Sequence, residues 1–254
     1  MFINEQGYNT LMTPKIQYPR RRAIRSILKA GIAAAFGILA KFEVEGRENL
    51  PTEGPLLIAA NHFHFLDPLA LIHTLPWPIE FVGGAQTPNA PSTVSWLNKA
   101  YGVIPTYRGT GSRQTLQHAE EVLKQKGILA IFPEGGSWAQ VLRPARPGTA
   151  FLVWRTQAPI LPVGLDDLLN FFGRVKLGQR VHVKVKFGKP FNASADLGDG
   201  RPSREQLDEM GHGIMRQISA LLPPDRQGFY SPDPAIREAA KGTEIYPWAT
   251  ETEG

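Results

Sequence analysis

The chain has 254 residues, of which 42% are hydrophobic and 20% charged, and its formal net charge is +5. This length and composition allow one full hydrophobic core, so we expect a single domain with short appendages. The absence of cysteine excludes disulfides and a thiolate nucleophile. The sequence also lacks the spacings of zinc sites, the G-x-S-x-G turn of serine hydrolases and the glycine-rich fingerprints of nucleotide-binding loops. We therefore expect no metal and no bound cofactor.

The N-terminal segment, residues 1–41, is strongly basic. Residues 6–42 contain no acidic residue, and their cationic residues are Lys15, Arg20, Arg21, Arg22, Arg25, Lys29 and Lys41. The uncharged apolar run at residues 30–40 is much shorter than the roughly 20 residues needed to cross a bilayer. Extended back through Ile24 and Ile27, it predicts an amphipathic helix in an anionic membrane interface, where each Lys or Arg contributes about 1 kcal/mol.

Other interpretations of this segment remain open. The helix could simply pack on the domain. A secretory signal peptide has a similar outline, but here the charges begin late and no clear small-residue cleavage site follows Phe42. Nucleic-acid binding is not expected, because the arginines lack interleaved aromatic residues and a recognisable motif.

A histidine and a carboxylate five positions apart follow the next apolar run. Residues 56–60 predict a short buried strand, and Asp67 followed by proline predicts a helix N-cap. His62 then lies in a strand-to-helix loop in which its imidazole can meet Asp67. An imidazole with a pKa of about 6.5 removes the proton of an attacking alcohol, and a carboxylate fixes its tautomer. Alternatively, Asp67 only caps the helix and the histidine only packs, as we expect of His64 and His73.

A short strand after Tyr101 ends at Arg108. A guanidinium in this place is a candidate bidentate clamp for an anion, and the alternative is a side chain that faces solvent. Residues 112–126 then predict a helix that ends at Gly127.

The apolar run at residues 128–132 predicts a second buried strand that ends abruptly in Pro133, Glu134, Gly135 and Gly136. Ligand sites of open α/β sheets gather at the carboxyl ends of strands, so this loop and the His62 loop are expected to share one site. Glu134 is a candidate acceptor of hydrogen bonds from a polyol, and the glycines let backbone N–H groups approach an oxygen closely. The alternative is a plain turn between a strand and a helix.

The remaining elements complete an α/β pattern. Residues 181–187 alternate apolar and basic side chains, which predicts a strand with one buried face, either a solvated edge strand or a surface for CoA phosphates or lipid headgroups. Ser203 and Gln206 predict a capping box ahead of a helix that ends before residues 223–224. The polar residues from 225 onward are expected to be loosely ordered or draped on the surface.

We therefore predict a single α/β domain with a central, largely parallel or mixed sheet flanked by helices, preceded by an N-terminal basic amphipathic helix. The predicted boundaries are residues 1–41 for the basic segment, 42–224 for the domain and 225–254 for the polar tail.

Four blocks in this order resemble the glycerolipid acyltransferase family, whose best-known members are 1-acylglycerol-3-phosphate acyltransferases. They are H-x-x-x-x-D at His62 and Asp67, Gly-x-Ile-x-x-x-Arg ending at Arg108, Phe-Pro-Glu-Gly at 132–135, and an apolar strand with two prolines at 158–164. The resemblance covers about residues 40–190.

The resemblance implies transfer of a fatty acyl group from acyl-CoA or acyl-carrier protein to a hydroxyl of a lyso-lipid, most often 1-acylglycerol-3-phosphate. His62 would be the general base and Asp67 would orient it. By the same resemblance Arg108, Glu134, Gly135 and Gly136 bind the acceptor. The enzyme is expected to be peripheral, on the cytoplasmic side of the membrane.

The chain departs from the family pattern at two places. The family usually has serine two positions after the histidine, where this chain has His64, and Thr-Arg-Ser after Glu-Gly, where it has Gly136, Ser137 and Trp138. Arg143 or Arg146 is a candidate replacement for the missing arginine, and Trp138 favours a bulkier or less charged acceptor. Two further hypotheses are a catalytically silent lipid-binding relative and a thioester or ester hydrolase.

Overall fold

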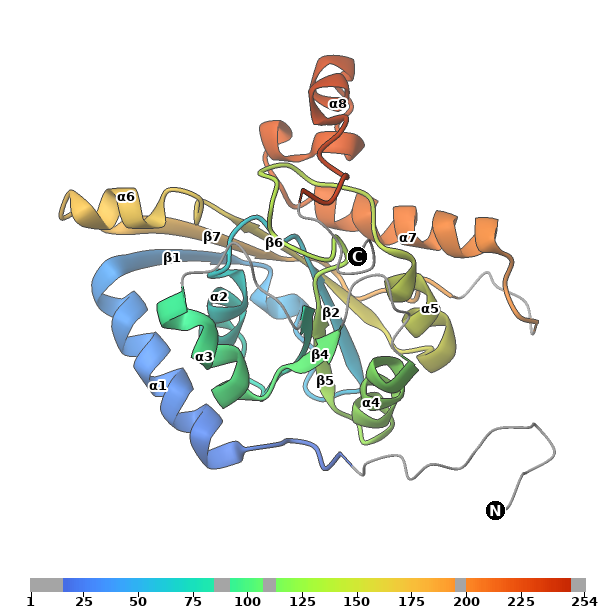
Figure 1. The fold of residues 1–254 in the computed structure, drawn as a ribbon, viewed down its shortest axis with the longest axis horizontal. Coiled ribbons are helices and arrows are strands. Elements are labelled where there is room, and N and C mark those ends of the chain that lie inside the picture. The colour runs from blue at the N-terminus through green and yellow to red at the C-terminus, as the bar shows by residue number, and fades with distance from the viewer. Residues whose placement is uncertain (1–15, 85–91, 107–112, 195–199, 248–254) are drawn as a thin grey trace, which may run out of the picture.

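The computed structural model describes residues 16–84, 92–106, 113–194 and 200–247. Its described strands form one seven-stranded sheet in the order β1-β7-β6-β2-β5-β3-β4 (Figure 1). The strands are β1 (Ala40–Glu45), β2 (Leu56–Ala60), β3 (Glu80–Gly84), β4 (Ile104–Thr106), β5 (Ile128–Ile131), β6 (Ile160–Asp166) and β7 (Val181–Phe187). Neighbours pair in parallel except β6 and β7, which pair antiparallel. The predicted α/β fold with a largely parallel sheet is confirmed.

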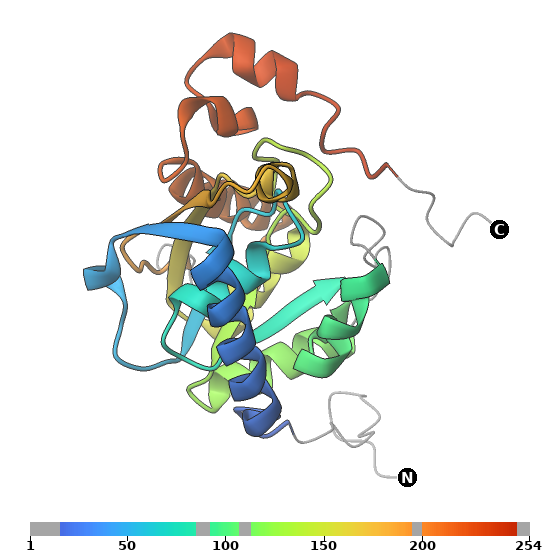
Figure 2. The ribbon, with the colours of Figure 1, turned by 90° about the vertical axis from the view of Figure 1, so that its left-hand side faces the viewer.

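Helices cover both faces of the sheet. They are α1 (Arg22–Leu39), α2 (Asp67–Thr74), α3 (Ser92–Tyr101), α4 (Arg113–Lys124), α5 (Pro147–Thr156), α6 (Phe171–Lys176), α7 (Arg204–Ser219) and α8 (Pro234–Ala240), with short 3-10 helices η1 (Arg47–Asn49), η2 (Pro224–Arg226) and η3 (Gly228–Tyr230). In Figures 1 and 2, α1, α2 and α3 lie on one side of the sheet and α4, α5 and α7 on the other. Residue 112, the expected start of α4, lies outside the described residues. The predicted capping box of Ser203 and Gln206 is present at α7.

The central strand β2 explains why the sheet needs two layers of helices. All five of its side chains are buried: Leu56, Ile58 and Ala60 join the core cluster on one face, and Leu57 and Ala59 join the other. A strand buried on both faces is a continuous apolar run, as expected for a parallel sheet inside an α/β domain.

Strand β7 has the predicted alternation, but it is not an edge strand. Its apolar side chains are buried while His182 and Lys184 are exposed. It lies between β1 and β6, so the expectation of a solvated edge was wrong. Alternation reports how many faces are buried and carries no information about neighbours along the hydrogen-bonding direction. On the solvent face Lys186 pairs with Glu45 of β1 at 3.1 Å.

Four cations of the N-terminal segment, Arg20, Arg21, Arg25 and Lys29, bind groups of the protein, whereas Arg22 and Lys41 are exposed. Arg20 and Arg25 both bind Glu80 of β3, and Arg21 donates to the carbonyls of Lys99 and Ala100. Lys29 donates to the carbonyl of Leu75 at 2.7 Å. The expected contact of the basic side chains with an anionic membrane is therefore corrected for these four residues, because their donors are bound within the protein.

The outward face of α1 is apolar instead. Ile27 and Ile38 are 72% and 73% exposed, and Ile24 is 46% exposed. Small residues of the same helix are also exposed: Ala23, Ala30, Gly31, Ala34 and Ala35. No helix in the described part of the chain combines the length and the hydropathy that a membrane span requires.

The described part of the segment after α7, through residue 247, contacts the domain. It contains η2, η3 and α8, and it hydrogen-bonds the loop that follows β5 at several points. Of the two states expected for these residues, the structure therefore has the one in which they are draped on the surface.

Candidate active site

His62 follows β2 at the carboxyl edge of the sheet, and its ring meets Asp67. Nδ1 of His62 lies 2.9 Å from Oδ2 of Asp67, so the two residues that the sequence paired are brought together. The imidazole stacks on Phe132, with ring centroids 4.1 Å apart. Its side chain is 15% exposed, and Nε2 makes no hydrogen bond with the described residues. With Nδ1 bonded to the carboxylate, Nε2 is the nitrogen left to take a proton.

Asp67 is buried, and its carboxylate organises the whole loop. Oδ2 accepts the backbone N–H groups of Phe63 and His64, both at 2.8 Å, in addition to its contact with His62. Asp67 is the first residue of α2 rather than its N-cap, which is Leu66. The expected capping role is therefore corrected: the carboxylate bonds the amides that precede the helix. These three contacts hold the ring and the backbone of the loop together.

Glu134 is also buried, and protein groups occupy both of its oxygens. Oε1 accepts a hydrogen bond from the backbone N–H of His62 at 2.7 Å. Oε2 accepts one from the side-chain Nε–H of Arg143 at 3.0 Å and one from the backbone N–H of Arg143 at 3.3 Å. The expectation that this carboxylate is open to a polyol is corrected, because it is 1% exposed. Burial raises the pKa of Glu134 to about 7, against the opposing effects of the Arg143 guanidinium and the backbone N–H groups.

The two glycines after Glu134 shape the loop. Gly135 has φ +80°, a conformation that favours glycine, and a Cβ there would lie 3.1 Å from Cγ of Arg146. Its N–H donates to the carbonyl of Phe132 at 3.0 Å, so this amide closes the turn instead of facing a ligand oxygen as expected. The carbonyl of Gly136 accepts a hydrogen bond from Arg143.

The candidate replacement arginines both have partners inside the protein. Arg143 is 1% exposed, binds Glu134 and lies 3.8 Å from the ring centre of Trp138. Arg146 donates to the carbonyl of Glu244 at 3.0 Å. Arg108, the candidate anion clamp, lies outside the described residues.

Asn61 is a site-forming residue that the sequence analysis did not single out. Its side-chain amide accepts the N–H of Leu165 at 2.7 Å and donates to the Leu165 carbonyl at 2.8 Å. It is fully buried and ties the end of β2 to β6. A polar residue directly between a buried strand and the histidine was the available signal, because a buried amide must be hydrogen-bonded.

An aromatic group borders the His62 loop on the side of α6. Phe172 stacks on Phe65 with centroids 5.8 Å apart, and His64 lies 6.1 Å from Phe172. Burial lowers the pKa of His64, opposed by the charge of Asp67. The ring of His64 packs against Phe65 and Phe172, which agrees with the packing role expected for it.

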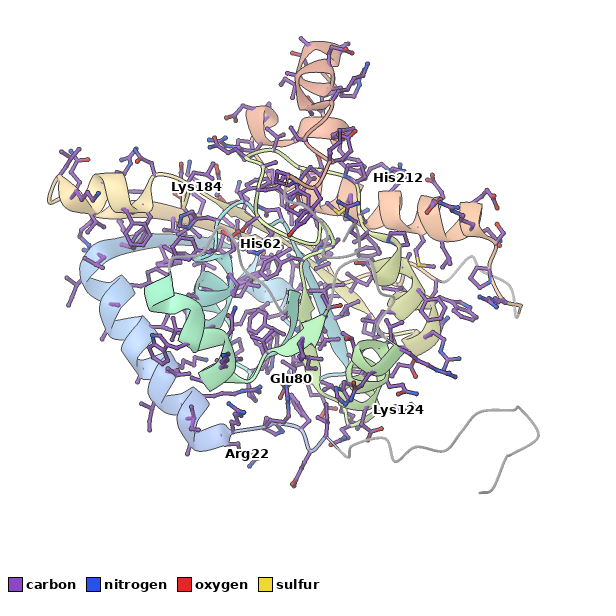
Figure 3. The ribbon with its side chains drawn as sticks, in the orientation of Figure 1. Arg22, His62, Glu80, Lys124, Lys184 and His212 are labelled. Atoms are coloured by element: carbon purple, nitrogen blue, oxygen red, sulfur yellow. The ribbon has the colours of Figure 1, made fainter. Side chains whose placement is uncertain are left out.

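The described residues include no group of three or more His, Cys, Asp or Glu side chains placed to hold a metal ion. In Figure 3, His62 lies at the upper edge of the sheet and Glu80 at the lower edge. The upper edge is the one at which β2 and β5 end, so the two loops share it as expected. The arrangement there is a histidine oriented by a buried aspartate beside an apolar flank of an α/β domain. An imidazole held in this way is chemically suited to take a proton from a hydroxyl.

Comparisons with known proteins show which family this chain is similar to. The sequence model described as "Acyltransferase" matches residues 41–166. The 1-acyl-sn-glycerol-3-phosphate acyltransferase of Bacillus subtilis is 24% identical over 180 residues, which are 70% of this chain and 87% of that protein. The lyso-ornithine lipid O-acyltransferase of Pseudomonas aeruginosa is 31% identical over 170 residues, or 59% of this chain and 64% of that protein.

Among solved structures, the 1-acyl-sn-glycerophosphate acyltransferase PlsC of Thermotoga maritima shares the fold with a TM-score of 0.55 at 20% identity. The match covers 81% of this chain and 83% of that one. The family model and the curated relatives support an O-acyltransferase of the 1-acylglycerol-3-phosphate acyltransferase-like family, and the solved structure shows the shared fold.

Proposed function

We propose that this enzyme transfers a fatty acyl group from a thioester donor to a hydroxyl of a lyso-lipid, with His62 as the general base. The observation that carries the proposal is the 2.9 Å contact between Nδ1 of His62 and Asp67, which leaves Nε2 for the hydroxyl proton. As the alcohol oxygen attacks the thioester carbonyl, Nε2 takes its proton and the carbon–sulfur bond breaks. The leaving thiolate then takes the proton from the imidazolium, so no covalent acyl-enzyme is needed.

The leading acceptor is 1-acylglycerol-3-phosphate, and the donor is acyl-CoA or acyl-carrier protein. The name of the Bacillus subtilis relative supports this acceptor. No cofactor beyond the donor is required, because proton transfer and thiolate departure need none.

A second acceptor class, a lyso-lipid without glycerol phosphate, is favoured by one feature of the site. Arg143 binds Glu134 and Arg146 binds the Glu244 carbonyl, so neither arginine is presented as an open phosphate ligand. The Pseudomonas aeruginosa relative is named for a lyso-ornithine lipid, whose headgroup is an amino acid.

We further propose that the protein is peripheral, on the cytoplasmic side of the membrane, and that the apolar outer face of α1 enters the interface. Ile24, Ile27 and Ile38 supply large apolar side chains on that face. Because Arg25 and Lys29 bind acceptors in the protein, attachment should depend on apolar insertion more than on the charge of the lipid.

One experiment tests the reaction and its acceptor. Wild type and H62A are assayed with acyl-CoA and acyl-carrier protein against lyso-lipids with and without phosphate, and both thiol release and acylated product are measured. General base catalysis is typically worth 10² to 10⁴-fold, so H62A should lose that much kcat at an unchanged melting temperature. Wild-type turnover in H62A would refute the proposal. Thiol release without acylated lipid would show hydrolysis, and no thiol release would show a binding protein.

A further inference from the structure

The C-terminal arm, residues 224–247, lies beyond the residues that match the acyltransferase family model, yet it contacts the catalytic edge of the sheet. It begins after α7 and lies beside the loop that carries Glu134 (Figure 1). We refer to residues 132–146 as the Glu134 loop. The two segments meet at two separate places.

At the first place the backbones of the arm and the loop bond each other directly. The N–H of Leu142 donates to the Arg226 carbonyl at 2.9 Å, and the N–H of Phe229 donates to the Leu142 carbonyl at 3.1 Å. Gly228 lies between them with φ +49°, and a Cβ there would lie 2.2 Å from the Leu142 carbonyl oxygen. This close approach is therefore possible only with glycine.

At the second place the arm holds the indole of Trp138. Nε1 of Trp138 donates to the Thr243 carbonyl at 2.8 Å, and Tyr246 meets the indole edge-to-face with centroids 5.4 Å apart. The guanidinium of Arg143 lies over the same indole, 3.8 Å from its centre. A guanidinium on an aromatic face gains both from stacking and from cation–π attraction.

These contacts continue to the catalytic histidine. Arg143 binds Oε2 of Glu134, and Oε1 of Glu134 accepts the backbone N–H of His62. We propose that the C-terminal arm is a positioning element for acyl transfer. It fixes Trp138, Trp138 fixes Arg143, and the Arg143–Glu134 pair fixes the backbone from which the His62 ring projects. The inference rests on the proposed function in taking His62 as the base.

The test uses two variants of the full chain that disturb the relay from different ends. W138A removes the surface on which Arg143 lies, and G228A forces the arm and Leu142, the residue before Arg143, apart. Because small displacements of catalytic groups reduce rates strongly, each should lower kcat roughly 10 to 100-fold and leave KM for the donor unchanged. The double variant should lose no more than the worse single variant, since both act through one chain of contacts.

Hydrogen exchange supplies a measurement that does not depend on activity. Both variants should speed exchange of the amide of His62, measured in peptides that cover residues 61–67, while exchange in β1 and α1 stays as in wild type. W138F keeps an aromatic face for Arg143 but loses the bond to the Thr243 carbonyl, so its kcat and its protection should lie between those of wild type and W138A. G213A is the matched glycine control, because Gly213 of α7 has no atom within 4 Å of an added Cβ.

Several outcomes overturn the inference. Wild-type kcat and exchange in W138A and G228A, with only a lowered melting temperature, would make the arm a structural cover. Independent losses that multiply in the double variant would also contradict a single relay. If G228A does not fold, Y246A makes the same test from the other end of the arm. If H62A keeps its activity the proposed function fails, whereas a dead H62A with unaffected arm variants removes this inference alone.

Discussion

Two buried carboxylates, Glu134 and Glu80, are each paired with arginine. They lie at opposite edges of the sheet, because Glu80 begins β3 and Glu134 follows the end of the parallel strand β5. Glu80 binds two guanidinium groups: Arg25 donates to both oxygens at 2.5 and 2.7 Å, and Arg20 adds bonds at 2.7 and 3.0 Å. Glu134 has one guanidinium contact at 3.0 Å, and its other oxygen holds the amide of His62.

The difference in partners gives the two groups opposite pKa shifts. Burial acts to raise the pKa of both carboxyl groups. At Glu80 the hydrogen bonds and charges of Arg25 and Arg20 outweigh burial, so the pKa of Glu80 lies below its ordinary value. At Glu134 the single guanidinium is outweighed, and burial raises the pKa to about 7. The Glu80 cluster attaches α1 to the domain, whereas Glu134 supports the His62 loop. The carboxylate whose charge is well balanced by arginines thus attaches a helix to the domain. The carboxylate whose charge is weakly balanced lies beside His62.

The largest effect is expected from E80A. Removing the carboxylate leaves Arg25, which is 5% exposed, without its counter-charge, and breaking such a buried pair costs about 3–5 kcal/mol. Urea denaturation should show this loss in the free energy of unfolding, and kcat of the folded fraction should be unchanged. E45Q is the control, because it breaks the exposed pair with Lys186 and should cost less than about 1 kcal/mol.

E134Q should show the reverse pattern, with a large loss of kcat and a smaller loss in the free energy of unfolding. Glutamine keeps an oxygen for the amide of His62 but presents an NH₂ group toward the donors of Arg143, so the loop must shift. A displacement of this kind costs on the order of 100-fold in kcat. Because the Glu134 pKa is already raised, its neutralisation should reduce the free energy of unfolding less than E80Q does. Equal losses in the two variants would contradict the comparison.

The pH dependence of stability should separate the two groups. Glu80 has a lowered pKa, so its contribution is present above about 4.5 and is lost as pH falls through its folded-state pKa. Glu134 has a raised pKa, so its contribution is present below about 4.5 and is lost as pH rises through about 7. Urea midpoints should be measured from pH 3 to 8. In E80Q the midpoint should no longer fall at acid pH as it does in wild type. In E134Q the change in midpoint between about pH 4.5 and 7 should disappear.

The pairing of His62 with Asp67 could be predicted because its geometry is local. A strand that ends at residue 60 and a helix that starts at residue 67 leave a loop too short to separate His62 from Asp67. The fold class followed from alternating strands and helices. The position of β7 between β1 and β6 could not be predicted, because it depends on pairings between distant parts of the chain.

The partners of charged groups were the part that sequence did not reveal. Glu80 and Arg25 are separated by 55 positions, and no local pattern joins them. One signal was available in α1: Arg25, Lys29, Ile32 and Phe36 recur at helical spacing, which places them on the face that packs inward. The run of cations suggested an outward surface only because charge was counted along the chain rather than around the helix.

The smallest effect should come from Arg20, and it tests which of the two arginines stabilises Glu80. The side chain of Arg20 is 26% exposed, and Arg25 still bonds both carboxylate oxygens in its absence. Water replaces the lost donor at such a position, so R20A should lower the free energy of unfolding by about 1 kcal/mol. R25A should cost several times more, because it leaves Glu80 buried with a single partner at its edge. If urea denaturation gave equal losses for R20A and R25A, the two guanidinium groups would share the charge equally and the inner pair would not be the anchor of α1.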